Sequence, residues 1–394
     1  MMVLLLKMPY MTRETCKADL ARTVSVLPNL RCVDLPEGFY SDDPASSTLK
    51  QELQARCHDL RKMKYHNGAE QSFTNLAQSR QWQCMEILEL SHLMVESNTF
   101  LHVVSSFPAL HQLKVVDAPW LNDSTFQVTS SSPSMPPLQS LSIQDAPNLT
   151  ANGLQLYLAR PEIREILSTL SLNSTGVLLQ SLHLVLASAP YLAYLSVNES
   201  VNRSLPAEPV PPLRSRSLHS LHFEVVSSTS SYGVRQPAES YYSYLAESLL
   251  SHSLPSLDTL YVRSNTFPET LLAPPAAPFA RQQADCIPRG LPHPLSVYSK
   301  GLDELEWNLT SVFPPTASGR RGSASVTRPI SAYSYGASLS PTWSGDGRRS
   351  SMVGNGFGGF LAVPGEGSGG GRVGSPFGKK GQGRSGSQSE AWMG

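Results

Sequence analysis

Apolar residues recur along the first 310 positions of the chain in one spacing, apolar-x-x-apolar-x-apolar. We call this spacing the frame, and its three apolar positions the frame positions. The end of each copy alternates apolar and mostly polar residues, which is typical of a β-strand that buries only one face. Successive copies start 30, 25, 25, 28, 29, 25, 26, 39 and 45 residues apart. The pattern therefore predicts ten similar units, whose apolar residues are Leu30-Val33-Leu35, Leu60-Met63-Tyr65, Met85-Leu88-Leu90, Leu110-Leu113-Val115, Leu138-Leu141-Ile143, Leu167-Leu170-Leu172, Leu192-Leu195-Val197, Leu218-Leu221-Phe223, Leu257-Leu260-Val262 and Leu302-Leu305-Trp307.

Two neighbouring units align without a gap at an offset of 28 residues. Leu113 to Phe126 reads LKVVDAPWLNDSTF, and Leu141 to Leu154 reads LSIQDAPNLTANGL. In both, Asp-Ala-Pro follows the strand directly, and a leucine, a polar turn and an apolar residue that opens a helix come next. A strand and a helix repeating at about 20–29 residues define the leucine-rich repeat. We therefore predict an α/β fold, a leucine-rich-repeat solenoid with a curved parallel sheet and outer helices.

The segments between the predicted strands carry apolar residues on one face at helical spacing. Prolines just before several strands support this interpretation, since proline lacks an N–H and ends the preceding helix. Each unit would bury its apolar face only against its neighbours, as in a solenoid. The predicted helices include Thr12–Leu27, Ala151–Leu167, Val177–Ala189 and Glu239–Ser253.

The first residues also fit the frame, as Met1-Leu4-Leu6, so the sequence predicts a strand at Val3–Leu6. Because solenoids need a polar cap at each end, we expect that an N-terminal piece is missing from this chain. A disordered start with coincidental leucines is the alternative. If the strand forms, we expect one of its edges to be unpaired, which favours aggregation.

The composition predicts two regions. Residues 1–312 would form the repeat domain, with about ten to eleven irregular repeats and proline-rich insertions near 203–213 and 264–295. The last 85 residues hold 20 of the 27 glycines and 16 serines, so they cannot bury enough apolar area to offset the entropy of ordering. We therefore expect residues 313–394 to form a disordered, basic Gly/Ser-rich tail.

Charge and cysteine content narrow the class of protein. The net charge is zero, but residues 310–394 carry +6 and residues 1–309 therefore −6, so the repeat region offers no basic footprint for nucleic acid. No stretch approaches the roughly 20 apolar residues of a membrane span, and the run Val3–Leu6 is shorter than a signal peptide needs. Five cysteines without paired spacing indicate reduced thiols. We expect a cytoplasmic or nuclear protein that contacts neither membrane nor nucleic acid.

The segment Asp145–Leu154 resembles the helix-bearing leucine-rich repeats of F-box proteins, in which a Leu-Thr-Asp-x-Gly-Leu element opens each helix. Residues 1–310 together look like a group of filamentous-fungal F-box/leucine-rich-repeat proteins with Gly/Ser-rich tails. The resemblance implies the substrate-binding part of a ubiquitin-ligase subunit, in which an F-box docks the cullin-based ligase through an adaptor. No F-box is visible here, so adaptor binding is expected only if one lies upstream. The alternative is a signalling or regulatory scaffold, including the GTPase-regulator type, unconnected to ubiquitin.

The chain lacks the residue patterns of catalysis. His219 and His222 are the best candidates for a metal pair, but an odd separation in a predicted strand puts them on opposite faces. Gly-x-Gly-x-x-Gly occurs at Gly354 and Gly365, in glycine-rich sequence without the strand and helix that phosphate binding requires. We expect no enzyme activity, no cofactor and no bound metal.

The candidate binding site is the concave face of the sheet, where the residues between the buried positions point outward. This face is basic near the N-terminus, small and polar in the middle, and aromatic and charged toward the C-terminus. Exposed Tyr and Arg are favoured interface residues, although an ordinary solvated face is the alternative for any one of them. The candidates for binding a protein client are Lys62, Lys64, Glu89, Lys114, Tyr194, His222, Tyr261, Arg263, Glu304 and Glu306.

The tail contains two candidate phosphorylation sites. Arg320-Arg321-Gly322-Ser323 and Arg348-Arg349-Ser350-Ser351 each place two arginines ahead of a serine, which suits a basophilic kinase with an acidic pocket. Arg/Ser-rich sequence also produces such matches by accident. Phosphate on Ser323 or Ser351 would reduce the positive charge of the tail.

Overall fold

The computed structural model describes residues 3–8, 16–35, 41–79, 81–128, 133–228, 236–272, 290–301 and 303–314. The chain divides into two units, Met1–Arg320 and Arg321–Gly394, and every described residue belongs to the first. Nearly all of the predicted tail, with Ser323, Ser351 and both glycine motifs, therefore lies outside the described residues.

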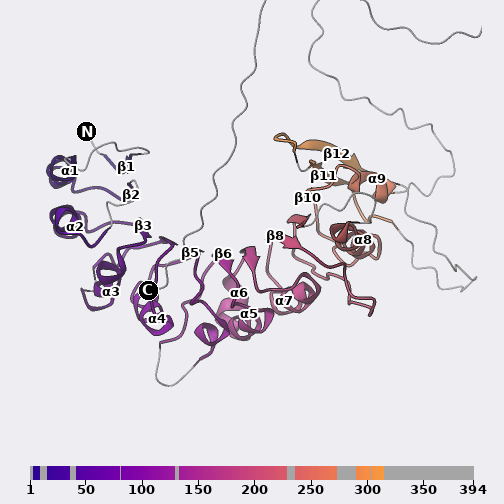
Figure 1. Cartoon of the computed structure of the whole chain (residues 1–394), viewed down its shortest axis with the longest axis horizontal. Helices are drawn as coiled ribbons and strands as arrows, with labels where there is room; N and C mark the ends of the chain where they lie inside the picture. Colours follow the sequence, from indigo (N-terminus) through magenta and orange to yellow (C-terminus); the bar gives the residue numbers. More distant parts are fainter. Residues whose placement is uncertain are drawn as a thin grey trace, which may run out of the picture. The chain divides into compact units, whose positions relative to one another are not determined.

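The described residues form one sheet of twelve strands, ordered as in the sequence. Neighbouring strands from the first to the eleventh are parallel, and the last pair is antiparallel. Figure 1 shows the strands on the inner side of this unit and the helices on its outer side, as the repeat pattern predicts. The strands are β1 (Leu5–Lys7), β2 (Cys32–Asp34), β3 (Lys62–His66), β4 (Ile87–Ser91), β5 (Gln112–Val116), β6 (Ser140–Ala146), β7 (Thr169–Thr175), β8 (Tyr194–Val201), β9 (Ser220–Ser227), β10 (Thr259–Val262), β11 (Leu295–Ser299) and β12 (Asn308–Val312).

The frame residues of nine predicted units are buried together in one continuous core, which confirms the repeat prediction for residues 30–262. Leu141 is 1% exposed and Leu195 0%, for example, and both belong to that core. The core is continuous because the strands pair frame position to frame position, as Leu113 with Leu141 and Leu141 with Leu170. Each unit therefore buries its apolar residues against the units on either side.

A left-handed residue lies at or next to the end of the strand in several units. His92, Asp117, Asp145 and Ser174 have φ of 54°, 53°, 52° and 49°, and each lies two positions after the last frame residue. Short polar side chains, Asp and Asn above all, tolerate this conformation best. This left-handed turn explains the aspartate of the Asp-Ala-Pro that the two aligned units share, since Asp117 directly follows its strand and Asp145 is the second-last residue of its strand.

The helices lie between the strands, and several of them begin at a capping residue or a proline. The segment predicted as one helix, Ala151–Leu167, is two, because Arg160 is extended and Pro161 starts a new helix. Thr150 caps the first of them, with its hydroxyl accepting from the N–H of Asn152 at 3.2 Å. The helices are α1 (Cys16–Ser25), α2 (Pro44–Arg56), α3 (Glu70–Ser79), α4 (Ser97–Ser105), α5 (Ala151–Leu158), α6 (Pro161–Ile166), α7 (Leu182–Ser188), α8 (Pro237–Leu250) and α9 (Phe267–Leu272), with 3₁₀ turns η1 (Asp123–Phe126) and η2 (Leu179–Ser181).

The predicted frame is wrong in detail at the start of the sheet. Leu6 pairs with Val33, the second frame position of the next unit, so the first unit is shifted by two residues from the prediction. Val3, Leu6 and Met8 pack against the core, whereas Leu4 is 38% exposed. Within the described residues β1 pairs only with β2, so its other edge is unpaired there.

The predicted tenth unit, Leu302-Leu305-Trp307, is also wrong. Leu305 is 94% exposed, and the repeat strand is β11, where Val297 pairs with Leu260 and Ser299 with Val262. Strand β12 then returns antiparallel to β11 and closes this end of the sheet. Leu302 itself lies outside the described residues.

The proline-rich insertion near 203–213 takes the place of a helix between β8 and β9. It runs along α8, where Leu205 N–H donates to Ser240 Oγ at 2.8 Å and Leu213 N–H to Ser248 Oγ at 3.0 Å. Serine side chains of α8 thus satisfy backbone groups that proline-rich sequence cannot pair in a helix. The second insertion contains α9, and residues 273–289 lie outside the described part of the chain.

Candidate protein-binding face of the sheet

The side chains on the helix-free face of the sheet form rows, because each strand pairs with the next in the same repeat position. Residues that point outward therefore follow one another across the strands, as Lys64, Glu89 and Lys114 do. The positions two residues before and after these along each strand point to the same side and form flanking rows. The central row consists of Lys64, Glu89, Lys114, Ser142, Ser171, Ser196, His222, Tyr261 and Tyr298.

Charges of opposite sign alternate at the N-terminal end of this face. Lys64 Nζ lies 2.9 Å from Asp34 Oδ1 and 3.5 Å from Glu89 Oε2, and Lys62 Nζ lies 2.6 Å from Glu89 Oε1. The hydrogen bond from Lys64 holds the pKa of Asp34 below its usual value. Two of the predicted lysines, Lys62 and Lys64, are thus engaged in ion pairs, whereas the third, Lys114, is exposed.

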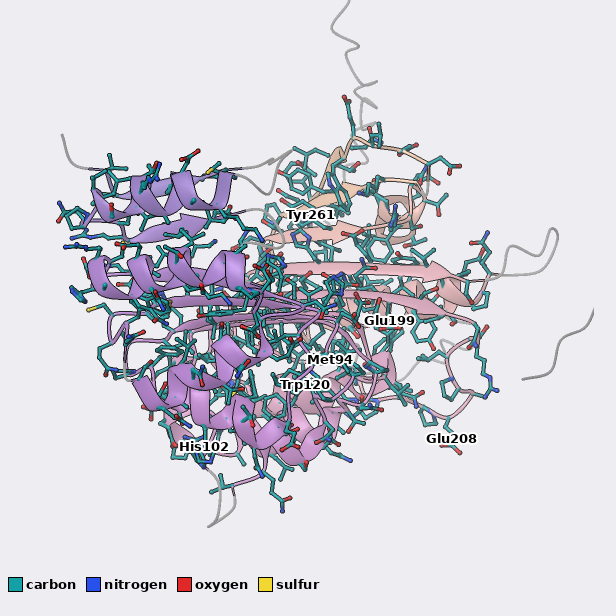
Figure 2. All side chains as sticks on the ribbon, turned by 60° about the vertical axis from the view of Figure 1, so that its left-hand side comes forward. Met94, His102, Trp120, Glu199, Glu208 and Tyr261 are labelled. Atoms are coloured by element: carbon teal, nitrogen blue, oxygen red, sulfur yellow. The ribbon has the colours of Figure 1, made fainter. Side chains whose placement is uncertain are left out.

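Aromatic rings stack on one another at the other end of the face. The His222 ring lies 3.8 Å from Tyr261, and Tyr261 lies 4.6 Å from Tyr298 with the planes 10° apart. Tyr194 extends the stack at 5.3 Å from His222, and Trp307 meets Tyr261 edge-on at 5.3 Å. Figure 2 shows Tyr261 on the strand side of the fold. We call these five residues the aromatic stack.

Burial within the aromatic stack lowers the pKa of His222, although nearby Glu224 acts in the opposite direction. A neutral imidazole stacks on tyrosine without the cost of a buried charge. Burial also raises the pKa of Tyr194. The stack is therefore a half-buried, uncharged surface, with charged groups beside it: Arg263 Nη1 lies 4.0 Å from Glu224 Oε2, and Lys300 Nζ lies 4.2 Å from the centre of the Trp307 ring.

The structure places the predicted site residues in three groups. Lys62, Lys64, Glu89 and Lys114 lie at the N-terminal end of the face, and Tyr194, His222, Tyr261 and Arg263 lie at the other. Glu304 and Glu306 lie between β11 and β12, and not on a repeat strand as predicted.

The carboxylate of Glu304 accepts from Gly301 N–H at 2.8 Å and from Asn265 Nδ2 at 3.1 Å, so it holds a turn together.

Sequence reasoning missed Asp34, Tyr298 and Lys300, and it placed Trp307 in the core. Asp34 was detectable, since it lies between two frame residues, Val33 and Leu35. Tyr298 was hidden because its strand has serine at a frame position.

The described residues offer few other sites for chemistry. They contain no group of three or more His, Cys, Asp or Glu side chains that could hold a metal ion. Cys32, Cys57 and Cys84 are free thiols, and burial raises the pKa of Cys57 to about 11, which makes it unreactive. No helix in the described part of the chain is both long and apolar enough to span a membrane.

Comparison with known proteins adds little to this description. No protein-family model matches the chain, and neither does any curated protein. Among solved structures, the chain is similar to the "Crystal structure of Rad7 and Elc1 complex in yeast", with a TM-score of 0.46 and 15% sequence identity. The match covers 67% of this chain and 64% of that chain. Similarity at this level carries no argument about function.

Proposed function

We propose that the chain is a non-enzymatic protein-recognition module whose client binds the helix-free face of the sheet. The observation that supports this most is the aromatic stack beside Arg263 and Glu224. Tyr, Trp and Arg are the residues most enriched where binding energy concentrates in protein interfaces. Their half-buried rings are already ordered by stacking, so a partner would bind them at a small entropic cost.

The dimensions of the face favour a polypeptide over a small molecule. Neighbouring strands lie about 4.8 Å apart, so the central row from Lys64 to Tyr298 spans nine strands and about 40 Å. A small molecule needs an enclosed pocket with convergent polar groups. An open row of this length, ionic at one end and aromatic at the other, suits an extended or folded protein client.

The two ends of the face have different roles in this proposal. The aromatic stack supplies the contacts that slow dissociation, because large rings lose the most water on binding. Lys62, Lys64 and Lys114 would approach acidic groups of the client and set its encounter rate and register. Because Asp34 and Glu89 already pair with two of these lysines, Lys114 would contribute most.

The assignment of this module to a ubiquitin ligase rests on the resemblance to F-box proteins alone. We propose the substrate-binding part of an F-box type ubiquitin-ligase subunit, acting in the cytoplasm or nucleus. The second candidate is a leucine-rich-repeat scaffold or GTPase regulator without a ligase. Co-purification of a ligase adaptor with the full natural gene product would favour the first, and its absence together with a bound client would favour the second.

Binding kinetics test whether the client binds the helix-free face of the sheet. The client is first isolated on the immobilised chain. Tyr261→Ala should speed dissociation about 5–150-fold, which corresponds to roughly 1–3 kcal/mol for a central interface residue. Tyr191→Ala is the matched control, since Tyr191 is 61% exposed between α7 and β8 and lies off the aromatic stack. Unchanged rates for Tyr261→Ala would place the client elsewhere.

A further inference from the structure

A cleft of about 450 Å³ lies apart from the helix-free face of the sheet, at the ends of β7 and β8. Its walls come from the segment after β7, from the end of β8, from the start of the proline-rich insertion and from α8, and they include Leu179, Glu199, Arg203 and Tyr241. Figure 2 labels Glu199 at this place.

The cleft lies where β8 departs from the pattern of β4 to β7. Two residues after the last frame position, those strands have a left-handed residue such as Asp145 or Ser174. In β8 that position is Glu199, and the strand continues to Val201. Because strand residues alternate faces, Glu199 points to the same side as buried Leu195, Val197 and Val201.

Glu199 is half-buried and lacks a cationic partner among the described residues. Burial raises the pKa of its carboxyl group, and the backbone amides of Ser200 and Thr175 only partly compensate. A carboxylate in such a position gains most from a cation that comes close to it, because screening by water is weak there. Arg203 is the other charged group of the lining, and it is exposed.

Apolar groups accompany the carboxylate. Val177, Leu179 and Val201 line the cleft and are buried, while Leu178 is 61% exposed at its edge. Lysine and arginine side chains bury their aliphatic stems on such surfaces and keep the charged head near a polar group. The combination fits a basic side chain better than a free inorganic cation.

We infer that this cleft binds a basic side chain, lysine or arginine, of a partner polypeptide, with Glu199 as the counter-ion. The site is separate from the sheet face, so it goes beyond the proposed function and does not depend on it. Arg203 would compete for Glu199 when the cleft is empty.

Saturation-transfer NMR on the full chain tests the site with blocked amino acids. N-acetyl-lysine methylamide or N-acetyl-arginine methylamide should bind, and the uncharged N-acetyl-norleucine methylamide should not. Glu199→Gln should weaken binding about tenfold, or 1.4 kcal/mol. Glu208→Gln, at an exposed position of the proline-rich insertion, should leave binding unchanged. Arg203→Ala should strengthen binding.

Glu199→Gln is expected to fold, since burial at this position disfavours the charged form of the side chain. Equal binding by Glu199→Gln and the unsubstituted chain, or by norleucine and lysine amides, would overturn the inference. Tighter binding of putrescine than of the blocked lysine would contradict a polypeptide ligand, because the cleft would then prefer a free amine. Binding should weaken as the pH falls, because protonation of Glu199 removes the counter-ion.

Discussion

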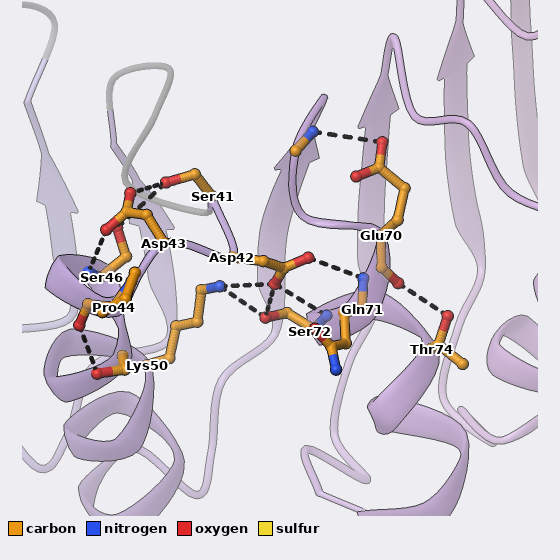
Figure 3. A network of polar contacts seen from close by, with 12 residues as sticks. Ser41, Asp42, Asp43, Pro44, Ser46, Lys50, Glu70, Gln71, Ser72 and Thr74 are labelled. Atoms are coloured by element: carbon orange, nitrogen blue, oxygen red, sulfur yellow. Dashed lines mark hydrogen bonds and ion pairs between the residues drawn. The ribbon is translucent and has the colours of Figure 1, made fainter.

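The carboxylate of Asp42 joins two neighbouring units, and its removal should destabilise the N-terminal part of the array. Asp42 precedes α2, yet it accepts hydrogen bonds from Gln71 N–H at 2.8 Å and Ser72 N–H at 3.0 Å, at the start of α3 in the next unit. Lys50 Nζ approaches the same carboxylate at 2.9 Å. Figure 3 shows this network beside Asp43, which caps its own helix α2 through Ser46 N–H.

The expected loss follows from these contacts. Removing an N-terminal cap costs about 1 kcal/mol, and a hydrogen bond to a charged group contributes about 1.5–3 kcal/mol. The Asp42 side chain is 23% exposed and that of Lys50 15%, so solvent screens the pair only in part. Because the contacts overlap, we expect Asp42→Ala to cost about 2–3 kcal/mol and Asp42→Asn, which keeps one acceptor oxygen, about half of that.

Urea unfolding measures the total cost, and hydrogen exchange of residues 70–79 shows where it falls. Asp19→Ala is the matched control. The Asp19 side chain, 74% exposed, pairs with that of Arg22, 84% exposed, and the loss of such a surface pair costs about 0.5 kcal/mol or less. Equal stability of the two variants, or unchanged exchange in α3, would refute the reasoning.

The pH dependence gives a second check of the same contact. Burial acts to raise the pKa of Asp42, but hydrogen bonds from Ser72, Lys50 and Gln71 outweigh it and hold the pKa below the usual 3.8. A group with a depressed folded pKa stabilises the fold above its unfolded pKa and loses that contribution as the pH falls through the folded value. The difference in free energy of unfolding between the unsubstituted chain and Asp42→Ala should therefore have its full value at neutral pH and decrease below about pH 3.8.

Two further predictions concern the core and the charged end of the face. Leu141→Ala should cost about 2–5 kcal/mol in urea unfolding, because Leu141 is 1% exposed, whereas Leu305→Ala, at 94% exposure, should change stability by about 0.5 kcal/mol or less. Lys114→Glu should slow association with the client and weaken its salt dependence without changing dissociation, and an unchanged association rate in stopped-flow would contradict the proposed role of this end.

The sequence predicted the fold well for residues 30–262, where all frame residues of the nine predicted units are apolar and buried. Leu113, Leu141 and Leu170 lie in register in one core because only one face of each strand can be buried. The run Leu4-Leu5-Leu6 fits two frames, and only pairing with β2 decides between them. The last repeat strand was not recognisable, since Pro294 and Ser299 occupy its first and third frame positions.

The candidate site was less predictable than the fold, because its properties come from pairs of residues on different strands. The sequence places lysines on the face, but their neutralisation depends on Asp34 and Glu89 lying next to Lys64 across the sheet. Trp307 reaches Tyr261 only because β12 turns back antiparallel to β11. Such a reversal leaves no signal in a repeat pattern.

Site-specific photocrosslinking tests the central claim most directly, because it shows which face the client touches. A benzophenone side chain would replace Ser171, in the small, polar middle of the central row, or His102, exposed on α4 and labelled in Figure 2. The account predicts that the client crosslinks to the chain with the probe at 171 and not at 102. Crosslinking from 102 alone would contradict it and place recognition on the helices.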